Sequence, residues 1–377
     1  MATAGREVLT ISATDAYPRN TEGAFALLND GRILYAYSRF IGGSADESEA
    51  EIYAVFSDDD GETWGGGRTL YRKGPEDVNI MSVSFLRMLD GSLGMFFIRK
   101  TGEGKEENSI IHLSRSYDEG MTWSESVRCI PCDGYFVTNN DRVIRLRSGR
   151  VIIPTSYHPA LQGRATSRFF ISDDDCASFH EASGRLELPF YDTVSGMQET
   201  GIAELKDGRL WAWARTAHGY QYEAFSEDQG ETWSDVRPNP FFTSPLSPLG
   251  AKHIGNSKLL AVFNPIPVFN GRFSVQGAPS PHAMAKSVKS YDMYHPFMTF
   301  CGRTPLTCAV SDGGPGEFLP LLKNLEDDPE LGFCYPAIFS NKDYVLIAYF
   351  FGYYKDGRAF YDSRIKKLSL DELTGKE

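Results

Sequence analysis

The 377-residue sequence contains no run of eighteen apolar residues and no apolar segment at its N-terminus. The first absence excludes a transmembrane helix. The second indicates that this chain carries no signal peptide, which favours a cytoplasmic location. Basic residues are also outnumbered, because the chain has 38 Lys and Arg but 50 Asp and Glu, which gives a formal net charge of -12. We therefore expect neither nucleic acid nor a membrane surface as a partner.

Cysteine is sparse and scattered, with six residues in the whole chain. Cys129 and Cys132 form one CxxC pair, but no second pair or nearby histidine completes a zinc site. The sequence therefore predicts no metal and no cofactor. We expect the cysteines to be buried free thiols.

Amphipathic helical patterns of useful length are nearly absent as well. In their place, short runs of Val, Ile, Leu and aromatic residues alternate with polar turns that contain glycine, which is typical of β-hairpins. The four clearest turns lie about 60 residues apart, with glycines at positions 31, 91, 149 and 208. Looser copies occupy residues 254–260 and 340–349.

A second repeat follows these hairpins. SDDDGETW (57–64), SYDEGMTW (116–123) and SEDQGETW (226–233) are near-copies, and SDDDCASF (172–179) and SDGGPGEF (311–318) are degraded versions. In this SxDxGxTW unit the Ser and Asp side chains can accept hydrogen bonds from turn amides, Gly takes a strained conformation and Trp packs beneath. The acidic run lacks the other ligands of a calcium loop. We therefore interpret the unit as a structural turn, called the clasp below.

Hairpins and clasps phased at one period indicate a single supersecondary unit, copied six times at about 60 residues each. Short strands in such a unit favour an all-β fold, a six-bladed β-propeller of four-stranded antiparallel blades. Residues 1–377 then form one domain. Because the inner strands of a propeller converge on its axis, residues in matching places of different repeats can meet there.

Three arginines occupy such places. Arg19 precedes the first hairpin, Arg215 follows the fourth, and Arg303 precedes the last clasp. Each alone is most simply a solvated surface charge. Together they can bind a carboxylate through charge-assisted, bidentate hydrogen bonds.

The clasp resembles the Asp-box of the sialidase (neuraminidase) superfamily, whose members are six-bladed propellers, and the resemblance covers essentially the full chain. It implies that Arg19, Arg215 and Arg303 clamp the carboxylate of a sialic acid. The first family arginine usually lies in an Arg-Ile-Pro motif, which this chain replaces with Arg19-Asn20-Thr21. The assignment of Arg19 therefore depends on its position ahead of the first blade.

The same resemblance implies a catalytic set. In QETGIAELKDGRLWAWAR the family glutamate corresponds to Glu199, and in FCYPAIF the family nucleophile corresponds to Tyr335. The acid/base falls on Asp46 in GGSADESEAEI, with Glu47 and Glu49 as alternatives. A neutral phenol suits this substrate, because an anionic nucleophile would be repelled by the anomeric carboxylate.

Further polar segments flank the third hairpin. NNDR supplies Asn140, Asp141 and Arg142, and SYH ends at His158, while NIMS (79–82) holds the matching place in the second repeat. Because similar segments recur in bacterial sialidase-like propellers, we expect these four residues to contact sugar hydroxyls. An internal Asp141–Arg142 ion pair and a structural histidine are the alternatives.

An insertion from Val268 to Phe300 interrupts the repeat period. Its Tyr291, Tyr294 and His295 can stack on a sugar if the insertion covers the binding face, but a plain surface loop explains them equally well.

The predicted function is an exo-acting retaining sialidase that hydrolyses terminal sialic or related nonulosonic acids from glycans. One alternative is a polysaccharide lyase acting on uronic acids, with His158 or a tyrosine as base. The other is a non-catalytic propeller that binds acidic glycans. In each case the expected partner is a sialylated or other acidic glycan.

Overall fold

The computed structural model describes residues 3–102, 107–159, 164–189, 195–255, 258–265, 303–316, 318, 322–353 and 361–375. In these ranges the chain is almost entirely β-strand, with one short helix, α3 (Leu370–Thr374), so the predicted all-β class is confirmed. Within the same ranges no helix has the length and apolar character needed to cross a membrane. The insertion with Tyr291, Tyr294 and His295 lies outside the described residues.

Three sheets each contain four antiparallel strands that are consecutive in the chain. The first consists of β2 (Arg19–Leu27), β3 (Ile33–Phe40), β4 (Ala50–Ser57) and β5 (Gly65–Arg72). The second consists of β15 (Gln198–Glu204), β16 (Leu210–Arg215), β17 (Tyr220–Ser226) and β18 (Arg237–Thr243). The third consists of β19 (Gly250–Ile254), β20 (Lys258–Phe263), β21 (Leu306–Ser311) and β22 (Lys323–Glu326).

A larger sheet covers two sequence repeats. One half consists of β6 (Asp77–Arg87), β7 (Leu93–Thr101), β8 (Asn108–Ser116) and β9 (Val127–Arg128). The other consists of β10 (Tyr135–Val137), β11 (Ile144–Arg145), β12 (Val151–His158), β13 (Thr166–Ser172) and β14 (His180–Glu181). The halves are joined by one parallel pairing, Tyr135 with Ser109. Each half therefore corresponds to one repeat.

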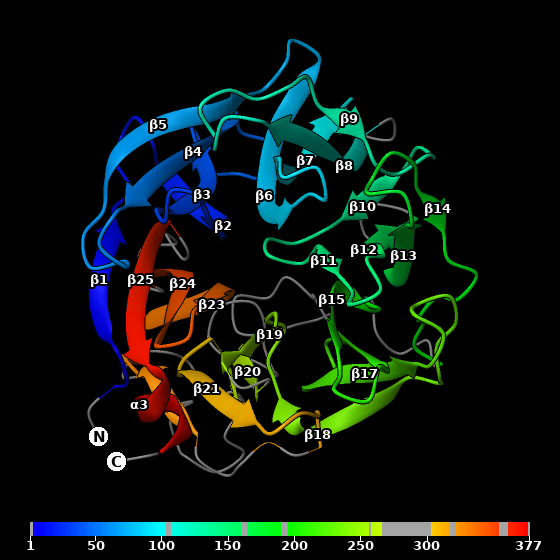
Figure 1. The fold of residues 1–377 in the computed structure, drawn as a ribbon. Coiled ribbons are helices and arrows are strands. Elements are labelled where there is room, and N and C mark those ends of the chain that lie inside the picture. Colours follow the sequence, from blue (N-terminus) through cyan, green and yellow to red (C-terminus); the bar gives the residue numbers. More distant parts are fainter. Residues whose placement is uncertain are drawn as a thin grey trace, which may run out of the picture.

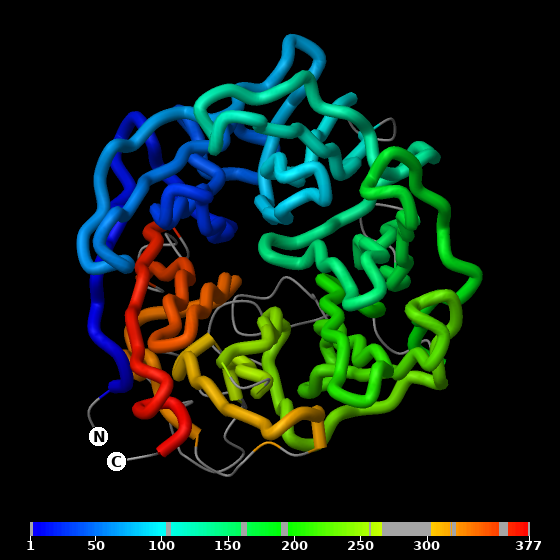
Figure 2. The backbone as a smooth tube through the Cα atoms, viewed as in Figure 1, coloured from blue at the N-terminus to red at the C-terminus, as the bar shows by residue number. Residues whose placement is uncertain are grey.

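The last sheet combines both ends of the chain. It contains β23 (Leu331–Ser340), β24 (Tyr344–Tyr353), β25 (Asp362–Ser369) and the N-terminal β1 (Arg6–Ile11), which pairs antiparallel with β25. Figure 1 shows blue β1 beside red β25, and the sheets follow one another around a ring. In Figure 2 the chain travels once around this ring, so strands from distant parts of the sequence approach a common centre.

The hydrophobic core lies between neighbouring sheets. In the first junction, Leu34 and Ile52 pack with Val83 and Phe97 of the next sheet. Because both faces of a sheet are covered in this way, several strands are continuous apolar runs, such as YVLIAYFFGY in β24. Each sheet therefore depends on its neighbours for burial.

The predicted hairpins are confirmed. Gly31 has φ 90° and donates its N–H to the carbonyl of Leu28 at 3.0 Å. The glycines at 91, 149 and 208 have φ of 84°, 96° and 89°. This left-handed conformation is why glycine recurs at these turns.

The clasps have the hydrogen bonds expected from the sequence. Ser57 Oγ accepts from the N–H of Gly61 at 2.8 Å, and the Asp59 carboxylate accepts from the N–H and hydroxyl of Thr63 at 2.8 and 2.5 Å. The same contacts recur in the units that start at positions 116, 172 and 226. In the last unit Gly313 takes the place of the aspartate, and Pro315, which has no N–H, takes the place of the glycine. Ser311 Oγ therefore accepts from the N–H groups of Gly313 and Gly314 instead, at 3.1 and 3.0 Å.

The cysteine expectation is correct at four positions and wrong at one. Cys129, Cys176, Cys308 and Cys334 are buried free thiols, whereas Cys132 is exposed. Only the first cysteine of the CxxC pair reaches the core between the two halves of the large sheet, and the second lies in the surface loop that follows. The sixth cysteine, at position 301, lies outside the described residues.

The clasps predict a specific acid sensitivity of the fold. Hydrogen bonds from the neighbouring hydroxyl and then from the backbone lower the pKa of Asp59, Asp118 and Asp174 from 3.8 to about 2. A group with a depressed folded-state pKa contributes stability above its unfolded pKa and loses it as pH falls through the folded value. We expect the Asp59→Asn/Asp118→Asn/Asp174→Asn variant to show a shallower fall in melting temperature between about pH 4 and pH 2 than the wild type.

Circular dichroism melts over this pH range measure the effect. The exposed Asp58→Asn variant is the control and should keep the wild-type pH dependence. A triple variant that loses stability as steeply as the wild type would contradict the role given to the clasp carboxylates.

Candidate active site

A left-handed irregularity recurs where the chain approaches the centre of the ring. Glu22, Ser82, Asp141, Glu199 and Tyr335 have φ of 58°, 63°, 56°, 53° and 55°. In β2, β6, β15 and β23 the strand register shifts at this position, which is the sign of a β-bulge. Such backbone costs about 1–3 kcal/mol per residue and is concentrated at functional sites. Each bulge therefore redirects one side chain at a corresponding place in the ring.

Two of these bulges bring Tyr335 and Glu199 into direct contact. The phenol of Tyr335 donates to Glu199 Oε1 at 2.5 Å, and Arg215 Nη1 lies 2.8 Å from the same oxygen and 3.3 Å from the phenol. Glu199 is buried, and its Oε2 has no hydrogen-bond partner among the described residues. The ring of Tyr335 stacks on Phe350 with centroids 4.8 Å apart.

The surroundings keep this phenol protonated. Burial raises the pKa of Tyr335 well above 10, Glu199 raises it further, and Arg215 and Arg303 oppose the shift. Tyr335 is therefore neutral at physiological pH, with a carboxylate in place to accept its proton.

Arg215 and Arg303 each also bond to a neutral side chain. Arg215 donates from Nε and Nη2 to Gln198 Oε1 at 3.2 and 2.6 Å. Arg303 is buried, its Nη1 lies 3.0 Å from Cys334 Sγ, and its guanidinium carbon lies 5.7 Å from the centre of the Tyr335 ring. Two of the three predicted arginines thus approach the phenol directly.

The third arginine contacts two carboxylates. Arg19 Nη1 donates to Asp46 at 2.5 Å, and Nη2 donates to Glu22 at 3.2 Å. Its guanidinium also lies 4.3 Å from the ring centre of Phe40. Burial lowers the pKa of Arg19, but Asp46, Glu22 and, last, an ionised Tyr335 raise it. Arg19 is therefore within electrostatic reach of the tyrosine that Arg215 and Arg303 approach directly.

Asp46 is the acidic residue of its loop that contacts Arg19. Its side chain is 55% exposed, and Lys100 Nζ donates to its backbone carbonyl at 3.2 Å. Partial desolvation would raise the pKa of Asp46, but Arg19 and Lys100 lower it to about 2. Asp46 is therefore ionised in the unliganded protein.

Glu22 and Gln198 received no role in the sequence analysis. Glu22 is buried, pairs with Arg19 and accepts a hydrogen bond from the Ser82 hydroxyl. Burial raises the pKa of Glu22, and Arg19 opposes this. A signal was present, because Glu22 lies nine residues before Gly31, as Glu199 lies nine residues before its own hairpin glycine.

Asn140 and Asp141 make internal contacts. The amide of Asn140 donates to the carbonyls of Gly23 at 2.8 Å and Tyr335 at 3.4 Å. Asp141 lies 2.6 Å from Lys252 Nζ and accepts from the N–H of Ile338 at 2.9 Å. Asp141 therefore forms its ion pair with Lys252, whereas the alternative in the sequence analysis was an ion pair with Arg142. Their contact with a sugar remains a prediction.

Arg142 and His158 lie close to the central cluster. Arg142 is buried and donates to the carbonyl of Leu249 at 2.7 Å, and burial lowers its pKa to about 10, against the charge of Glu199. Burial and then Arg215 lower the pKa of His158 to about 4, so the imidazole is neutral at pH 7. Arg142 thus adds a fourth cation to the cluster, and His158 adds none.

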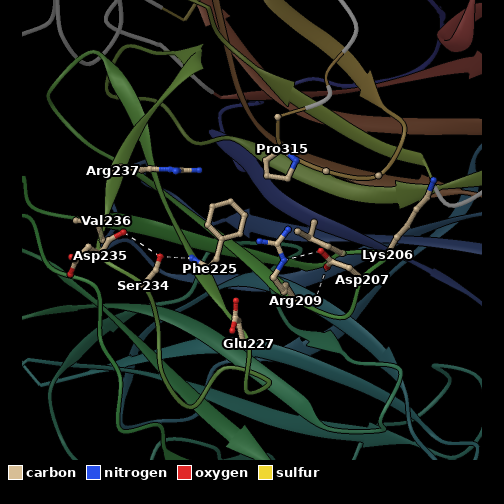
Figure 3. A pocket seen from close by; sticks show the side chains of 14 residues that line it. Lys206, Asp207, Arg209, Phe225, Glu227, Ser234, Asp235, Val236, Arg237 and Pro315 are labelled. Carbon is tan, nitrogen blue, oxygen red and sulfur yellow. Dashed lines mark hydrogen bonds and ion pairs between the residues drawn. The ribbon is translucent and has the colours of Figure 1, made fainter.

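A separate hollow of about 950 Å³ contains none of the predicted site residues (Figure 3). In it, Phe225 lies beside Arg209, whose Nε is 2.8 Å from Asp207, and Lys206 donates to the carbonyl of Asp312. These cations already have partners. Among the described residues, no group of three or more His, Cys, Asp or Glu side chains is arranged to hold a metal ion.

The contacts of Asp141 predict a structural cost. We expect Asp141→Ala to lower the free energy of unfolding by about 1–3 kcal/mol, because the Ile338 N–H and the Lys252 ammonium lose their acceptor. Urea denaturation measures this, with exposed Asp235→Ala as the control. An unchanged free energy of unfolding in Asp141→Ala would show that this carboxylate does not stabilise the inner strands.

Comparisons with known proteins bear on the fold. The profile of the BNR repeat-like domain family matches residues 31–347. A search of curated proteins found no match. A protein of unknown function from Dyadobacter fermentans DSM 18053 is 15% identical with a TM-score of 0.69, and the alignment covers 97% of this chain and 99% of that one.

Two solved sialidase structures are also similar. The NanB sialidase from Streptococcus pneumoniae is 13% identical with a TM-score of 0.69, over 99% of this chain and 72% of that one. The intramolecular trans-sialidase from Ruminococcus gnavus, solved with oseltamivir carboxylate, is 14% identical with a TM-score of 0.68, over 96% of this chain and 97% of that one. At these identities the likeness concerns the fold. Because the family profile spans most of the sequence, the chain belongs to the BNR repeat-like domain family and has the fold of the sialidase superfamily.

Proposed function

We propose that this chain is a single-domain, six-bladed β-propeller that acts as an exo-acting retaining sialidase on terminal sialic or related nonulosonic acids. One observation carries the proposal. A neutral, partly buried phenol donates to a buried carboxylate beside Arg215 of β16 and Arg303 of the segment before β21, with Arg19 of β2 within electrostatic reach. The count of six blades is supported by the large sheet, whose two halves are joined by one pairing.

In the first step, Arg19, Arg215 and Arg303 hold the substrate carboxylate. The phenol oxygen of Tyr335 attacks the anomeric carbon while the bond to the leaving oxygen breaks. Glu199 takes the phenolic proton, and Asp46, which has taken up a proton from solvent in the substrate complex, gives that proton to the leaving oxygen. The neutral nucleophile avoids repulsion by the carboxylate that the arginines hold.

In the second step, the Asp46 carboxylate takes a proton from water, and the water oxygen attacks the anomeric carbon. The bond to Tyr335 breaks, and Glu199 returns the proton to the phenolate. Two displacements at one carbon give net retention. Arg142, which is buried near Glu199, remains charged throughout because its pKa is about 10.

One alternative follows from His158. A neutral imidazole near Arg215 can act as a base, as a lyase acting on uronic acids requires. A non-catalytic propeller that binds acidic glycans would need the arginines but neither Tyr335 nor Asp46. The direct contact between Tyr335 and Glu199 favours the sialidase over both.

The deciding experiment is a fluorogenic sialoside assay run beside a screen for ultraviolet-absorbing products from uronic-acid polymers. The proposal predicts release of the fluorophore and no unsaturated product. Mass analysis of the released sugar then separates hydrolysis from intramolecular transfer. Unsaturated product would identify a lyase, and binding of acidic glycans without turnover would identify a binding module.

We expect Tyr335→Phe to lower turnover by about a thousandfold, because phenylalanine removes the nucleophilic oxygen. The variant keeps the ring that stacks on Phe350, so the fold should be preserved. Single-turnover kinetics measure the effect, and thermal shift with an unreactive sialic acid analogue tests whether binding survives. Near-wild-type turnover would exclude Tyr335 as the nucleophile.

Arg215→Ala should weaken binding of the same analogue by about 30-fold, the equivalent of about 2 kcal/mol. The loss removes a carboxylate ligand and leaves Glu199 without its ion pair. Arg209→Ala, in the separate hollow of Figure 3, is the matched control and should bind normally. If titration calorimetry gives Arg215→Ala and the wild type equal affinities for the analogue, Arg215 does not bind the carboxylate.

A further inference from the structure

Arg19 is shared between two carboxylates that differ in burial. Glu22 is 6% exposed and lies on the bulge of β2. Its carboxylate also accepts a hydrogen bond from the Ser82 hydroxyl. The side chain of Asp46 is 55% exposed and extends from the loop between β3 and β4. One partner of Arg19 is therefore anchored in the fold, and the other is free to turn toward solvent.

Asp46 and Glu22 bond to different nitrogens of the guanidinium. Asp46 accepts from Nη1 at 2.5 Å, whereas Glu22 accepts from Nη2. A ligand carboxylate that binds Arg19 needs donors of the same kind, and Nη1 already serves Asp46. The loop backbone is held by Lys100, which donates to the carbonyl of Asp46, so only the side chain has to move.

We propose that the carboxylate of the bound sugar displaces Asp46 from Arg19 while Glu22 holds the guanidinium, and that the displaced Asp46 then takes up a proton and becomes the acid. The inference rests on the proposed function. It makes Asp46 a specificity-determining residue, because a sugar without a carboxylate leaves Asp46 ionised and unable to protonate a leaving group.

The charges around Asp46 support this direction. In the unliganded protein Arg19 and Lys100 lower its pKa to about 2 against the effect of partial desolvation. The neighbouring groups that interact with Asp46 or with Lys100 are Glu22, Glu107, Tyr135 and Glu47. When the ligand carboxylate neutralises Arg19, Lys100 is the remaining cation, and the added negative charge raises the pKa of Asp46.

The step balances simply. One proton moves from solvent to a carboxylate oxygen of Asp46, and no bond to carbon forms or breaks. The same proton later passes to the leaving oxygen. Binding is therefore coupled to proton uptake, so affinity should rise as pH falls, by up to about tenfold per pH unit.

The test is titration calorimetry of the whole chain with 2-deoxy-2,3-didehydro-N-acetylneuraminic acid, a carboxylate analogue that has no leaving group. Titrations between pH 5 and pH 8, in buffers with different ionisation enthalpies, give the number of protons taken up. The wild type should take up protons and bind more tightly at lower pH. Asp46→Asn should bind several-fold more tightly at pH 8, because the competitor of the ligand is gone, and should show no uptake.

Two further variants separate the possible proton acceptors. His158 packs edge-on against Tyr135, with ring centroids 5.8 Å apart, so its imidazole has to be tested as an acceptor. His158→Gln should keep the wild-type uptake, because the proton goes to Asp46. Glu22→Gln should weaken binding, because Arg19 loses its fixed partner, while keeping the uptake.

The outcomes distinguish the two proposals. If the analogue does not bind the wild type, the proposed function fails. If it binds with no proton uptake at any pH, or if Asp46→Asn takes up as many protons as the wild type, the displacement is wrong while the proposed function stands.

Discussion

The hydrogen bond between Tyr335 and Glu199 is the contact on which the rest of the site depends. A buried carboxylate is costly unless it is paired, and Arg215 supplies the opposite charge at 2.8 Å. Arg215 is fixed in turn by Gln198, its neighbour across β15 and β16. Glu199 and Tyr335 both lie on bulges with left-handed backbone. The strained backbone directs the two side chains toward each other.

The charges around this contact are distributed unequally. Arg303 bonds to Cys334 and to the carbonyl of Leu246, and Arg142 bonds to the carbonyl of Leu249, whereas Arg19 bonds to two carboxylates. Guanidinium groups near Tyr335 suit an anionic ligand, although the chain as a whole is acidic. The repeated turns serve a different purpose. Along β15 the bulge at Glu199 and the hairpin after Glu204 lie at opposite ends, so the same strand provides both chemistry and scaffold.

Local turn chemistry explains why the hairpins and clasps could be predicted, because glycine conformation and serine or aspartate hydrogen bonds act within a few residues. The pairing of Tyr335 with Glu199 came only from resemblance, since nothing local joins residues 136 positions apart. Lys252, the partner of Asp141, lies 111 positions away from it and belongs to no recognisable sequence motif. Glu22 did have a signal, its spacing to Gly31, but burial of a carboxylate cannot be seen without the fold.

The most direct test of a tyrosine nucleophile is covalent trapping with 2,3-difluorosialic acid. Fluorine at the 3-position slows both steps, and the 2-fluoride is a good leaving group, so a glycosylated enzyme should accumulate. After proteolysis, mass spectrometry should find the adduct on Tyr335, and Tyr335→Phe should remain unlabelled. An adduct on another residue, or turnover of a sialoside with no covalent species, would contradict the proposed mechanism.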